Sequence, residues 1–478
     1  MSNRKTLFSH GLRGLPGHLV RCLWMPPHRP SLFPVLVLVM GLGGLGSTGC
    51  DPAETEVSQD PPKVPTQPDE KVFLDCPEDL VCEDIPAAYE ARSEKMGDYG
   101  NYDLANRPSD GLDIRYIVIH TTEGAWNGVV SHFQNPRASA SAHYLVGSEN
   151  GRVAKFVSPR HVAWHAGNWY FNMHSIGIEH EAIAIEGHKW FTDAMYAASA
   201  KLVRHLAKTY GVPLDRQHIL GHDEMPGVTA ARQAGMHWDP GPYWDWERYM
   251  RLLSAPLSDT EDPGHEGQPI LFVPPFAQNT QPGSYCYAGT PPDCRDVPPA
   301  PSNFALLRTG PSLTAALIEN QYLKGVPGDR MNNWGTKIGT GPMYVRAQRV
   351  GDFDGIFFDG KLAYFHNPNR SLTRTAVAVR GRPVSAKPSA PVYGVAYPNE
   401  TSFFPPTVPL TPEKIYDLPA GQTYVLGVRA LGDYYYAKEF VPAHDPKKQI
   451  VVKDNTEYYQ VHFNHRVAWI KAQDLELP

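Results

Sequence analysis

The sequence RYIVIHTTEG runs from Arg115 to Gly124 and joins a β-branched segment to a polar turn. The run of isoleucine and valine favours a buried strand, and the threonines, glutamate and glycine after it favour a turn at the end of that strand. His120 stands where the strand becomes the turn. An imidazole there can leave the sheet edge and face a cleft, although a single histidine of this kind is more often structural.

Other regular elements are predicted on both sides of this segment. They are strands over 143–146, 153–157 and 176–180, and helices over 86–95, 193–210 and 244–253. The longest helix has Thr192 as a candidate cap, apolar residues at helical spacing, and Gly211 as a stop. Strands interspersed with helices predict an α/β domain with a mixed central sheet flanked by helices.

Length and composition limit the remaining possibilities. A chain of 478 residues is long enough for about three domains of the usual ~150 residues. The formal net charge of −6 gives no general cationic surface, so nucleic acid is not expected as a partner. The 46 prolines cluster in the first 100 residues and again between 255 and 302, where they indicate linkers.

The N-terminal region has the features of an export signal. Residues 1–31 carry several arginines and no acidic residue, and the apolar run 32–40 has the length of a signal core. The end of this leader, 45–50, resembles the lipobox of bacterial lipoproteins, which implies lipidation of Cys50 and membrane anchoring. Met25 is an alternative start. We therefore expect an exported protein of the cell envelope, either lipid-anchored or periplasmic, or an extracellular one.

The other cysteines form two short-range pairs, Cys76 with Cys82 and Cys286 with Cys294. An exported protein meets an oxidising environment, so two disulfides are predicted. The alternative is a zinc site with four cysteine ligands, but the spacing within each pair is wider than that pattern requires.

The sequence after residue 302 predicts short strands separated by turn residues. The segment 353–366 aligns without gaps with 458–471, and each half of this internal repeat reads as a hairpin. Both hairpins resemble those that close bacterial SH3-like barrels. The predicted organisation is a leader (1–50), a disordered acidic tether (51–71), an α/β domain with an N-terminal extension (72–256), a Pro-rich linker (257–302), and two small all-β SH3-like units (303–372 and 373–478).

Two further polar motifs accompany His120. Gly221-His222-Asp223-Glu224 follows the long predicted helix, and His237-Trp238-Asp239-Pro240 follows fifteen residues after His222. Two histidines and an aspartate form a suitable ligand set for catalytic zinc, which takes three protein ligands and keeps a fourth position open. His120, His222 and Asp239 are therefore the candidate zinc ligands.

Five ordered motifs together resemble those of the type 2 N-acetylmuramoyl-L-alanine amidases, which share their fold with peptidoglycan recognition proteins. The motifs are IVIHTTEG at 117–124, WHAGN at 164–168, SIGIEHE at 175–181, GHD at 221–223 and HWDPGP at 237–242. The resemblance covers about 110–250 and implies that His120, His222 and Asp239 bind Zn²⁺. It also implies that Glu179 is the catalytic glutamate, in preference to Glu181 on the same side of the strand.

The resemblance implies a reaction and further roles. We expect hydrolysis of the amide between the lactyl group of N-acetylmuramic acid and L-alanine in peptidoglycan or muropeptides. His237 would stabilise the oxyanion or donate a proton. The residues predicted to bind the substrate are Thr121, Tyr144, Trp164, His165, Asn168 and Trp169. The alternatives are a recognition protein that binds peptidoglycan without cutting it, an adhesive protein whose β units bind the wall, and an amidase for a soluble muropeptide.

Overall fold

The structure is a computed structural model that describes most of the chain after the first cysteine pair begins. The described residues are 76–287, 289–375, 383–386, 389–399, 412–437 and 439–476. The predicted leader, tether and lipidation at Cys50 lie outside them. Within the described ranges, we find no helix with the length and apolar character needed to cross a membrane.

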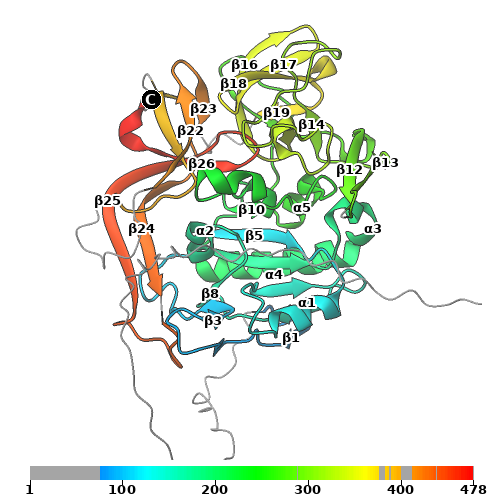
Figure 1. Cartoon of the computed structure of the whole chain (residues 1–478). Helices are drawn as coiled ribbons and strands as arrows, with labels where there is room; N and C mark the ends of the chain where they lie inside the picture. Colours follow the sequence, from blue (N-terminus) through cyan, green and yellow to red (C-terminus); the bar gives the residue numbers. More distant parts are fainter. Residues whose placement is uncertain are drawn as a thin grey trace, which may run out of the picture.

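A six-stranded mixed sheet forms the centre of the α/β part, as predicted (Figure 1). Its order is β1 (Cys82–Asp84), β7 (Val153–Lys155), β6 (Tyr144–Val146), β9 (Ser175–His180), β5 (Tyr116–Thr121) and β10 (Ile219–Gly221). The helices are α1 (Trp126–Phe133), α2 (Trp169–His174), α3 (Gly187–Trp190), α4 (Asp193–Tyr210) and α5 (Trp246–Leu252). Strand β5 is parallel to both of its neighbours, β9 and β10.

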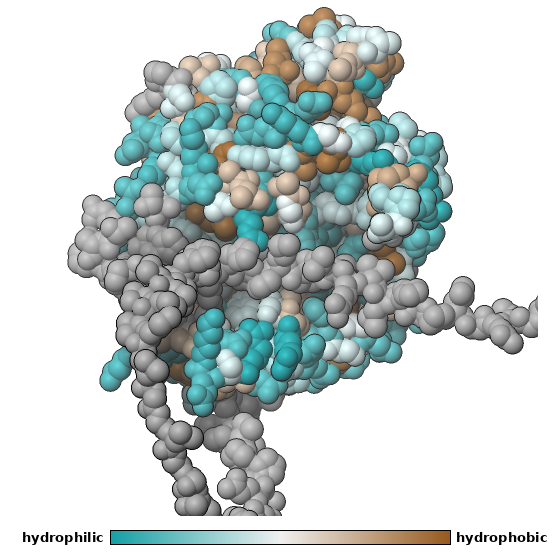
Figure 2. All heavy atoms as spheres, in the orientation of Figure 1, coloured by the Kyte–Doolittle hydropathy of each residue, from teal (hydrophilic) through white to brown (hydrophobic). Residues whose placement is uncertain are grey.

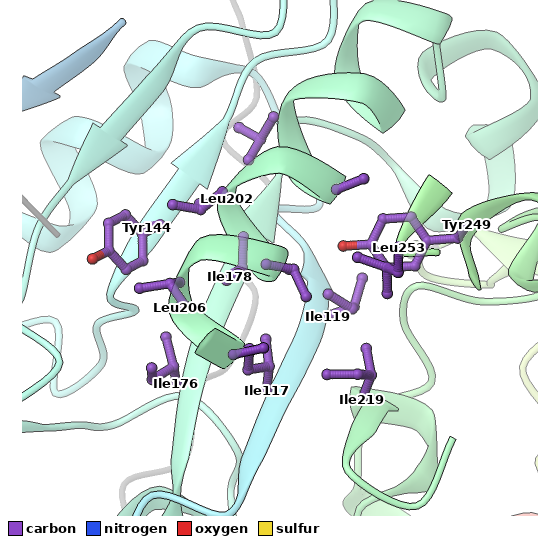
Figure 3. Packing of buried hydrophobic residues seen from close by; sticks show 14 of the residues in the cluster. Ile117, Ile119, Tyr144, Ile176, Ile178, Leu202, Leu206, Ile219, Tyr249 and Leu253 are labelled. Atoms are coloured by element: carbon purple, nitrogen blue, oxygen red, sulfur yellow. The ribbon is translucent and has the colours of Figure 1, made fainter. Parts of the chain in front are cut away.

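The alternation of side chains along each strand gives the sheet two different faces. Ile117, Ile119, Ile176 and Ile178 are fully buried on the face covered by α4 and α5 (Figure 3). The next residues along the strands, including His120, point to the opposite face. One face is therefore an apolar core, and the other face carries polar chemistry at the ends of its strands.

The helix predictions have mixed outcomes. Helix α4 has the predicted bounds because the Thr192 side chain accepts a hydrogen bond from the Met195 N–H, and Gly211 adopts a left-handed φ of 72°. Helix α5 is confirmed within a shorter span. The prediction of a helix over 86–95 is wrong, since that segment contains β2 (Glu90–Ala91), which pairs with β3 (Tyr99–Gly100).

The C-terminal region is mostly β-strand, and it begins earlier than predicted. The first β unit is a five-stranded sheet in the order β18 (Lys361–His366), β17 (Phe353–Phe358), β16 (Met343–Val350), β11 (Pro269–Phe272) and β19 (Thr373–Thr375). Strand β11 lies in the expected linker, and β19 lies beyond the expected end of the unit. The segment 257–302 is therefore more than a linker, because β11 completes the sheet between β16 and β19.

The segment predicted as a linker also contains a disulfide-linked hairpin, β12 (Gly283–Tyr287) with β13 (Asp293–Val297). Cys286 and Cys294 are directly opposite in it and form the predicted disulfide. Cys76 and Cys82 form the other predicted disulfide, next to edge strand β1. Two further short strands pair nearby, β14 (Phe304–Leu306) with β15 (Lys337–Gly339).

The second β unit contains another five-stranded sheet and a smaller one. The larger has the order β22 (Lys414–Pro419), β21 (Ser389–Tyr393), β26 (Val467–Lys471), β25 (Gln449–His462) and β24 (Arg429–Ala437), and the smaller has β23 (Thr423–Val425), β20 (Pro383–Ala386) and β27 (Leu475–Glu476). Both repeated segments are hairpins, and their registers agree: Phe353 pairs with His366 as Tyr458 pairs with Lys471. The SH3-like assignment of the two units stays a prediction.

The second β unit shares a hydrophobic core with the α/β part. Tyr116 and Val118, on the same face of the central sheet as His120, lie in one buried hydrophobic cluster with Tyr458 and Trp469. Figure 1 shows β24 and β25 running along the α/β part beside α2. The surface seen in Figure 2 is mostly hydrophilic where it is described, with apolar patches chiefly over the first β unit. The α/β part and the second β unit are thus packed against each other as one body.

Candidate metal centre and active site

Three polar side chains converge at the carboxyl edge of β5 and β10. His120 is on β5, His222 follows β10 directly, and Asp239 lies in the loop after the 3₁₀ helix Ala230–Gly235. Adjacent parallel strands bring their carboxyl ends to the same edge, which explains why residues about a hundred positions apart meet.

The distances and burial in this cluster fit a metal site. His120 Nδ1 is 3.0 Å from His222 Nδ1 and 3.5 Å from Asp239 Oδ2, while His222 Nδ1 is 3.1 Å from Asp239 Oδ1. The ligand atoms all lie within 4.8 Å of one another, and the three residues are buried. Burial lowers the pKa of His222 to about 3. For Asp239, burial alone would raise the pKa, but His222 and hydrogen bonds from the neighbouring histidines hold it well below its ordinary value. Neutral imidazole and ionised carboxylate are the forms that bind metal.

A chain of hydrogen bonds fixes the tautomer of His120. The Ser175 hydroxyl donates to the Phe171 carbonyl, so its oxygen accepts from His165 Nε2–H, 3.1 Å away. His165 Nδ1 then accepts from His120 Nε2–H at 2.9 Å. The Nδ1 lone pair of His120 is left facing His222 and Asp239, as a ligand requires.

Glu179 lies beside this cluster on β9. It is directly opposite His120 in the parallel register of β5 and β9, so both side chains are on the polar face. Only 4% of Glu179 is exposed, and its Oε2 has no hydrogen-bond partner among the described residues. Burial, helped by the negative charges of Asp239 and Glu123, raises the pKa of Glu179 well above its ordinary value. A buried, unpaired carboxylate of this kind suits acid–base chemistry.

Glu181 has a different role from Glu179. Its Oε1 accepts the N–H of Trp126 at the start of α1, and its Oε2 accepts the N–H of Ser148. Both carboxylate oxygens of Glu181 are therefore used to hold the backbone at Trp126 and at Ser148. The structure therefore separates the two glutamates that the sequence placed on one side of the strand.

His237 is the accessible member of the site, with 41% of its side chain exposed. Its ring stacks on His222, with centroids 4.7 Å apart, and its Nδ1 is 3.5 Å from Asp239 Oδ1. Burial would lower the pKa of His237, but the hydrogen bond and charge of Asp239 outweigh this effect and raise it. A partly exposed imidazole with a raised pKa can carry a positive charge near the reacting group.

Glu123 was not predicted as a site residue. Its Oε1 accepts hydrogen bonds from the Thr121 hydroxyl and the Ala184 N–H, each at 2.9 Å. Burial raises its pKa to about 7, with a further contribution from Asp239. The sequence signal that could have identified Glu123 is its place in the HTTEG turn.

Thr121, which was predicted to bind substrate, donates its backbone N–H to Asp239 Oδ2 and so orients a candidate ligand.

The structure corrects three of the residues predicted to bind substrate. Tyr144 is fully buried on the apolar face with α4, away from the metal cluster. Asn168 is also fully buried, where it caps α2 and donates to the carbonyls of Pro226 and Gly394. His165 is fully buried as the partner of His120. Sequence spacing does not reveal what packs over each side chain.

The two tryptophans predicted for the groove have different surroundings. Trp169 donates its Nε1–H to the Tyr435 carbonyl on β24, 3.1 Å away, and packs against the core shared with the second β unit. Trp169 is still partly exposed, so its role in substrate binding stays a prediction. Trp164 is partly exposed and donates to Asp103 Oδ2 at 2.8 Å. Its role in substrate binding stays a prediction.

A buried His-His-Asp set that could hold a metal ion lies beside an unpaired carboxylate at the edge of a mixed α/β sheet. Such a site is typical of one class of hydrolases, in which a metal ion and an acid–base group act on one bond. Within that class, the chain belongs to the N-acetylmuramoyl-L-alanine amidase family. The sequence pattern of that family matches residues 110–242, which include all three candidate ligands and Glu179.

Curated relatives carry the same family name. N-acetylmuramoyl-L-alanine amidase A of Achromobacter lyticus is 32% identical over 171 residues, covering 32% of this chain and 89% of the relative. The 1,6-anhydro-N-acetylmuramyl-L-alanine amidase AmpD of Haemophilus influenzae is 35% identical over 116 residues, covering 23% of this chain and 56% of the relative. The similarity to these relatives covers at most about a third of the chain.

Solved structures of amidases are also similar to part of the chain. One is the complex of the N-acetylmuramyl-L-alanine amidase AmiD from E. coli with anhydro-N-acetylmuramic acid-L-Ala-D-gamma-Glu-L-Lys. It is 21% identical, with a TM-score of 0.27, and the match covers 32% of this chain and 65% of that chain.

Proposed function

We propose that this protein is an exported, zinc-dependent amidase that hydrolyses the bond between the lactyl group of N-acetylmuramic acid and L-alanine in peptidoglycan. The observation that carries this proposal is the buried, unpaired Oε2 of Glu179 beside the His-His-Asp cluster. Family membership supports the choice of amide bond, and the site supplies groups for both halves of the hydrolysis.

His120, His222 and Asp239 would hold the zinc ion. Zinc supplies Lewis-acid chemistry, which polarises a carbonyl and lowers the pKa of water. Asp239 is itself held by the Thr121 N–H, and His120 by His165. These supporting bonds fix the orientation of two ligands before substrate arrives, which limits the reorganisation needed during the reaction.

Glu179 would move the proton. Its Oε2 takes a proton from the attacking water, whose oxygen forms a bond to the lactyl carbonyl carbon. The bond from that carbon to the L-alanine nitrogen then breaks, and the proton on Oε2 passes to this nitrogen, which leaves as an amine. The buried, unpaired Oε2 of Glu179 suits this task, because the same group must accept a proton and then release it.

His237 would stabilise the negative charge that develops on the carbonyl oxygen. Asp239 raises its pKa, so the ring is protonated more readily than that of an ordinary histidine, and its partial exposure makes the ring accessible to substrate. A fixed positive charge near a developing oxyanion lowers the barrier, since it stabilises the transition state more than the ground state.

Two disulfides support the proposed export. Cys76–Cys82 and Cys286–Cys294 are both formed within the described residues. Disulfides persist in oxidising compartments and are rare in the cytosol. A cell-envelope or extracellular location, where peptidoglycan is the accessible substrate, agrees with this chemistry. Anchoring through a lipidated Cys50 remains part of the proposal.

The test is digestion of purified peptidoglycan by the protein without residues 1–50, reconstituted with zinc. New L-alanine amino termini are assayed beside new reducing sugar ends. We expect amino termini without reducing ends, and loss of both the activity and the metal on chelation. Tight binding of peptidoglycan by zinc-loaded protein without release of amino termini would instead establish a recognition protein that does not cut the wall.

Glu179→Gln and Glu181→Gln form a matched pair for this digestion. The first removes the proposed proton carrier and should abolish release. The second changes a carboxylate that binds only backbone N–H groups, so most of the activity should remain. Equal loss in both variants would contradict the assignment of Glu179.

A further inference from the structure

The turn between β25 and β26 contacts two segments of the α/β part, one that carries the candidate ligand His222 and one that carries the candidate ligand Asp239. This turn, 463–466, belongs to the second β unit and is more than 220 residues from those segments along the chain. One segment runs from His222 to Met225, and the other from Met236 to Asp239. Neither is in a strand or an α-helix, so their positions depend on contacts made by their neighbours.

Arg466 bridges these two segments with one guanidinium group. Its NH1 donates to the Met225 carbonyl, and its NH2 donates to the His237 carbonyl at 2.7 Å and, more weakly, to the Met236 carbonyl at 3.3 Å. Met225 is three residues after the ligand His222, and His237 is two before the ligand Asp239. The planar, rigid fork of an arginine can fix two backbone segments relative to each other.

Arg466 is itself held in place. Only 2% of it is exposed, and its guanidinium lies over the ring of Trp334, 4.3 Å from the centroid. Asn464 within the same turn accepts the Arg466 N–H. Burial lowers the pKa of Arg466 to about 10, so the group remains protonated at neutral pH. The donor fork is therefore rigid and charged where it meets the carbonyls.

The same hairpin makes two more contacts with the His222 segment. His465 Nε2 is 2.8 Å from Asp223 Oδ2, and His462 Nε2 is 3.2 Å from Glu224 Oε1. Glu224 in turn accepts the Gly221 N–H at 2.7 Å and pairs with Arg216 at 2.6 Å. The two residues after His222 are thus attached to one hairpin, and Glu224 also holds the Gly221 N–H before it.

We propose that Arg466 is a positioning residue of the metal centre, through which the second β unit sets the separation of His222 and Asp239. The inference rests on the proposed function only in requiring that these residues bind a metal ion. It makes the second β unit a component of the catalytic centre and not a separate wall-binding module. Metal sites tolerate ligand displacements of only about 0.5 Å, so loss of this bridge should weaken binding.

The test measures the metal affinity of the full chain and not its activity. The metal-free protein is titrated with Co²⁺ in the presence of a competing chelator, and the visible spectrum of the bound Co²⁺ reports the ligand geometry. Arg466→Lys keeps the buried charge but loses the fork, and Arg466→Ala loses both. We expect both variants to bind Co²⁺ about 10–100-fold more weakly, the range seen when groups that support ligands are removed, and to change its spectrum.

Arg346→Ala is the matched control. Arg346 is also an arginine with only 1% exposure that donates to backbone carbonyls, those of Pro263 and Gly264, and it pairs with Asp354 inside the first β unit. Its removal should lower the melting temperature and leave the Co²⁺ affinity within twofold of the wild type.

Two results would overturn the inference. One is wild-type affinity and an unchanged Co²⁺ spectrum in Arg466→Lys, and the other is equal weakening in Arg346→Ala. If Arg466→Ala does not fold, Arg466→Lys alone decides between these outcomes. Failure of the proposed function is recognised separately, since it would appear as wild-type protein that binds metal but releases no L-alanine termini.

Discussion

At His120, the hydrogen bond made by one ring nitrogen decides what the other nitrogen can do. His165 accepts from Nε2–H because its own Nε2–H is committed to Ser175. The candidate ligand nitrogen is therefore set by a chain of groups that are not themselves candidate ligands. Mutation of supporting residues of this kind typically lowers metal affinity or activity about 10–100-fold.

His165→Phe removes the acceptor while filling most of the ring volume. We expect metal affinity to fall about 10–100-fold, because the His120 tautomer is no longer fixed. Chelator competition measures this change. Ser175→Ala, which removes only the end of the chain, should have a smaller effect, and a larger effect in Ser175→Ala than in His165→Phe would contradict the order of the chain.

Glu179→Gln tests the proton carrier by itself. The amide keeps the shape of the side chain but cannot accept the proton of water, so kcat should fall about 10²–10⁴-fold. Metal content should stay at the wild-type level, because Glu179 is not a ligand. Steady-state kinetics and metal analysis of the same preparation check both statements; loss of metal together with activity would assign Glu179 to the metal site instead.

The grouping of His120, His222 and Asp239 could be predicted because two histidines and an aspartate in short polar motifs suit zinc, and the structure brings them together. Glu179 was marked by the resemblance to the amidase family. The groove residues could not be predicted. Tyr144 and Asn168 are buried by packing that involves α4 and the segment containing Gly394, and no local pattern records those contacts. Arg466 gave no signal, since its role depends on contacts with residues more than 220 positions away.

At the scale of elements, β9 shows how one glycine places a histidine. A Cβ on Gly177 would lie 2.5 Å from His165 Cγ, so the strand leaves room for the ring only because this position lacks a side chain. Gly177 is on the same face as Glu179, two residues further along. The strand therefore positions Glu179 directly and positions His120 through His165.

Gly177→Ala should displace the His165 ring. We expect a loss of about 1–3 kcal/mol in unfolding free energy from overpacking, together with weaker metal binding. Denaturant unfolding and metal titration measure the two effects. Gly128→Ala in α1 is the control, because a Cβ there meets nothing within 4 Å and should stabilise the helix by about 0.5–1 kcal/mol. Unchanged metal binding in Gly177→Ala would contradict the claim that β9 positions His120 through His165.

Elements with local signals were predicted well. Helix α4 has its cap and its stop in the sequence, and the two hairpins have alternation and turns that fix their common register. Strand β11 was missed because it has only four residues in a proline-rich stretch, and its stability comes from pairing with β16 and β19. The helix predicted over 86–95 failed because backbone pairing outweighed local propensity there.

At the scale of the whole molecule, a buried charge network joins the α/β part to the second β unit. Asp433 on β24 pairs with Arg115 at 2.7 Å and with His174 at 2.8 Å, and it is only 1% exposed. Burial alone would raise the pKa of Asp433, but His174 and Arg115 outweigh it and lower the pKa. The network therefore stabilises the ionised carboxylate, and with it the docked arrangement.

Asp433→Asn should cost about 3–5 kcal/mol at neutral pH, since it leaves Arg115 without its buried partner. Because the folded-state pKa is depressed, the contribution is fully present above the unfolded value of about 3.9 and is lost as the pH falls through the lower folded value. The stability gap between wild type and variant should thus stay constant from pH 7 to about 5 and narrow below about 4. Denaturant midpoints at each pH measure it.

Asp113→Asn is the control for that series. Its carboxylate is 3.7 Å from the same Arg115, but 58% of the side chain is exposed, so its loss should change stability by less than about 1 kcal/mol. A pH-independent gap for Asp433→Asn, or an equal effect of Asp113→Asn, would contradict the account of how the two parts are joined.

The most direct test of the central claim is hydrolysis of a defined N-acetylmuramoyl peptide in ¹⁸O-labelled water by the zinc-loaded protein, followed by mass spectrometry of both products. Attack on the lactyl carbonyl predicts one ¹⁸O in the muramic acid carboxylate and none in the released peptide, whose amino terminus is L-alanine. Label in the peptide, or cleavage at any other bond, would contradict the assignment of this site as an N-acetylmuramoyl-L-alanine amidase.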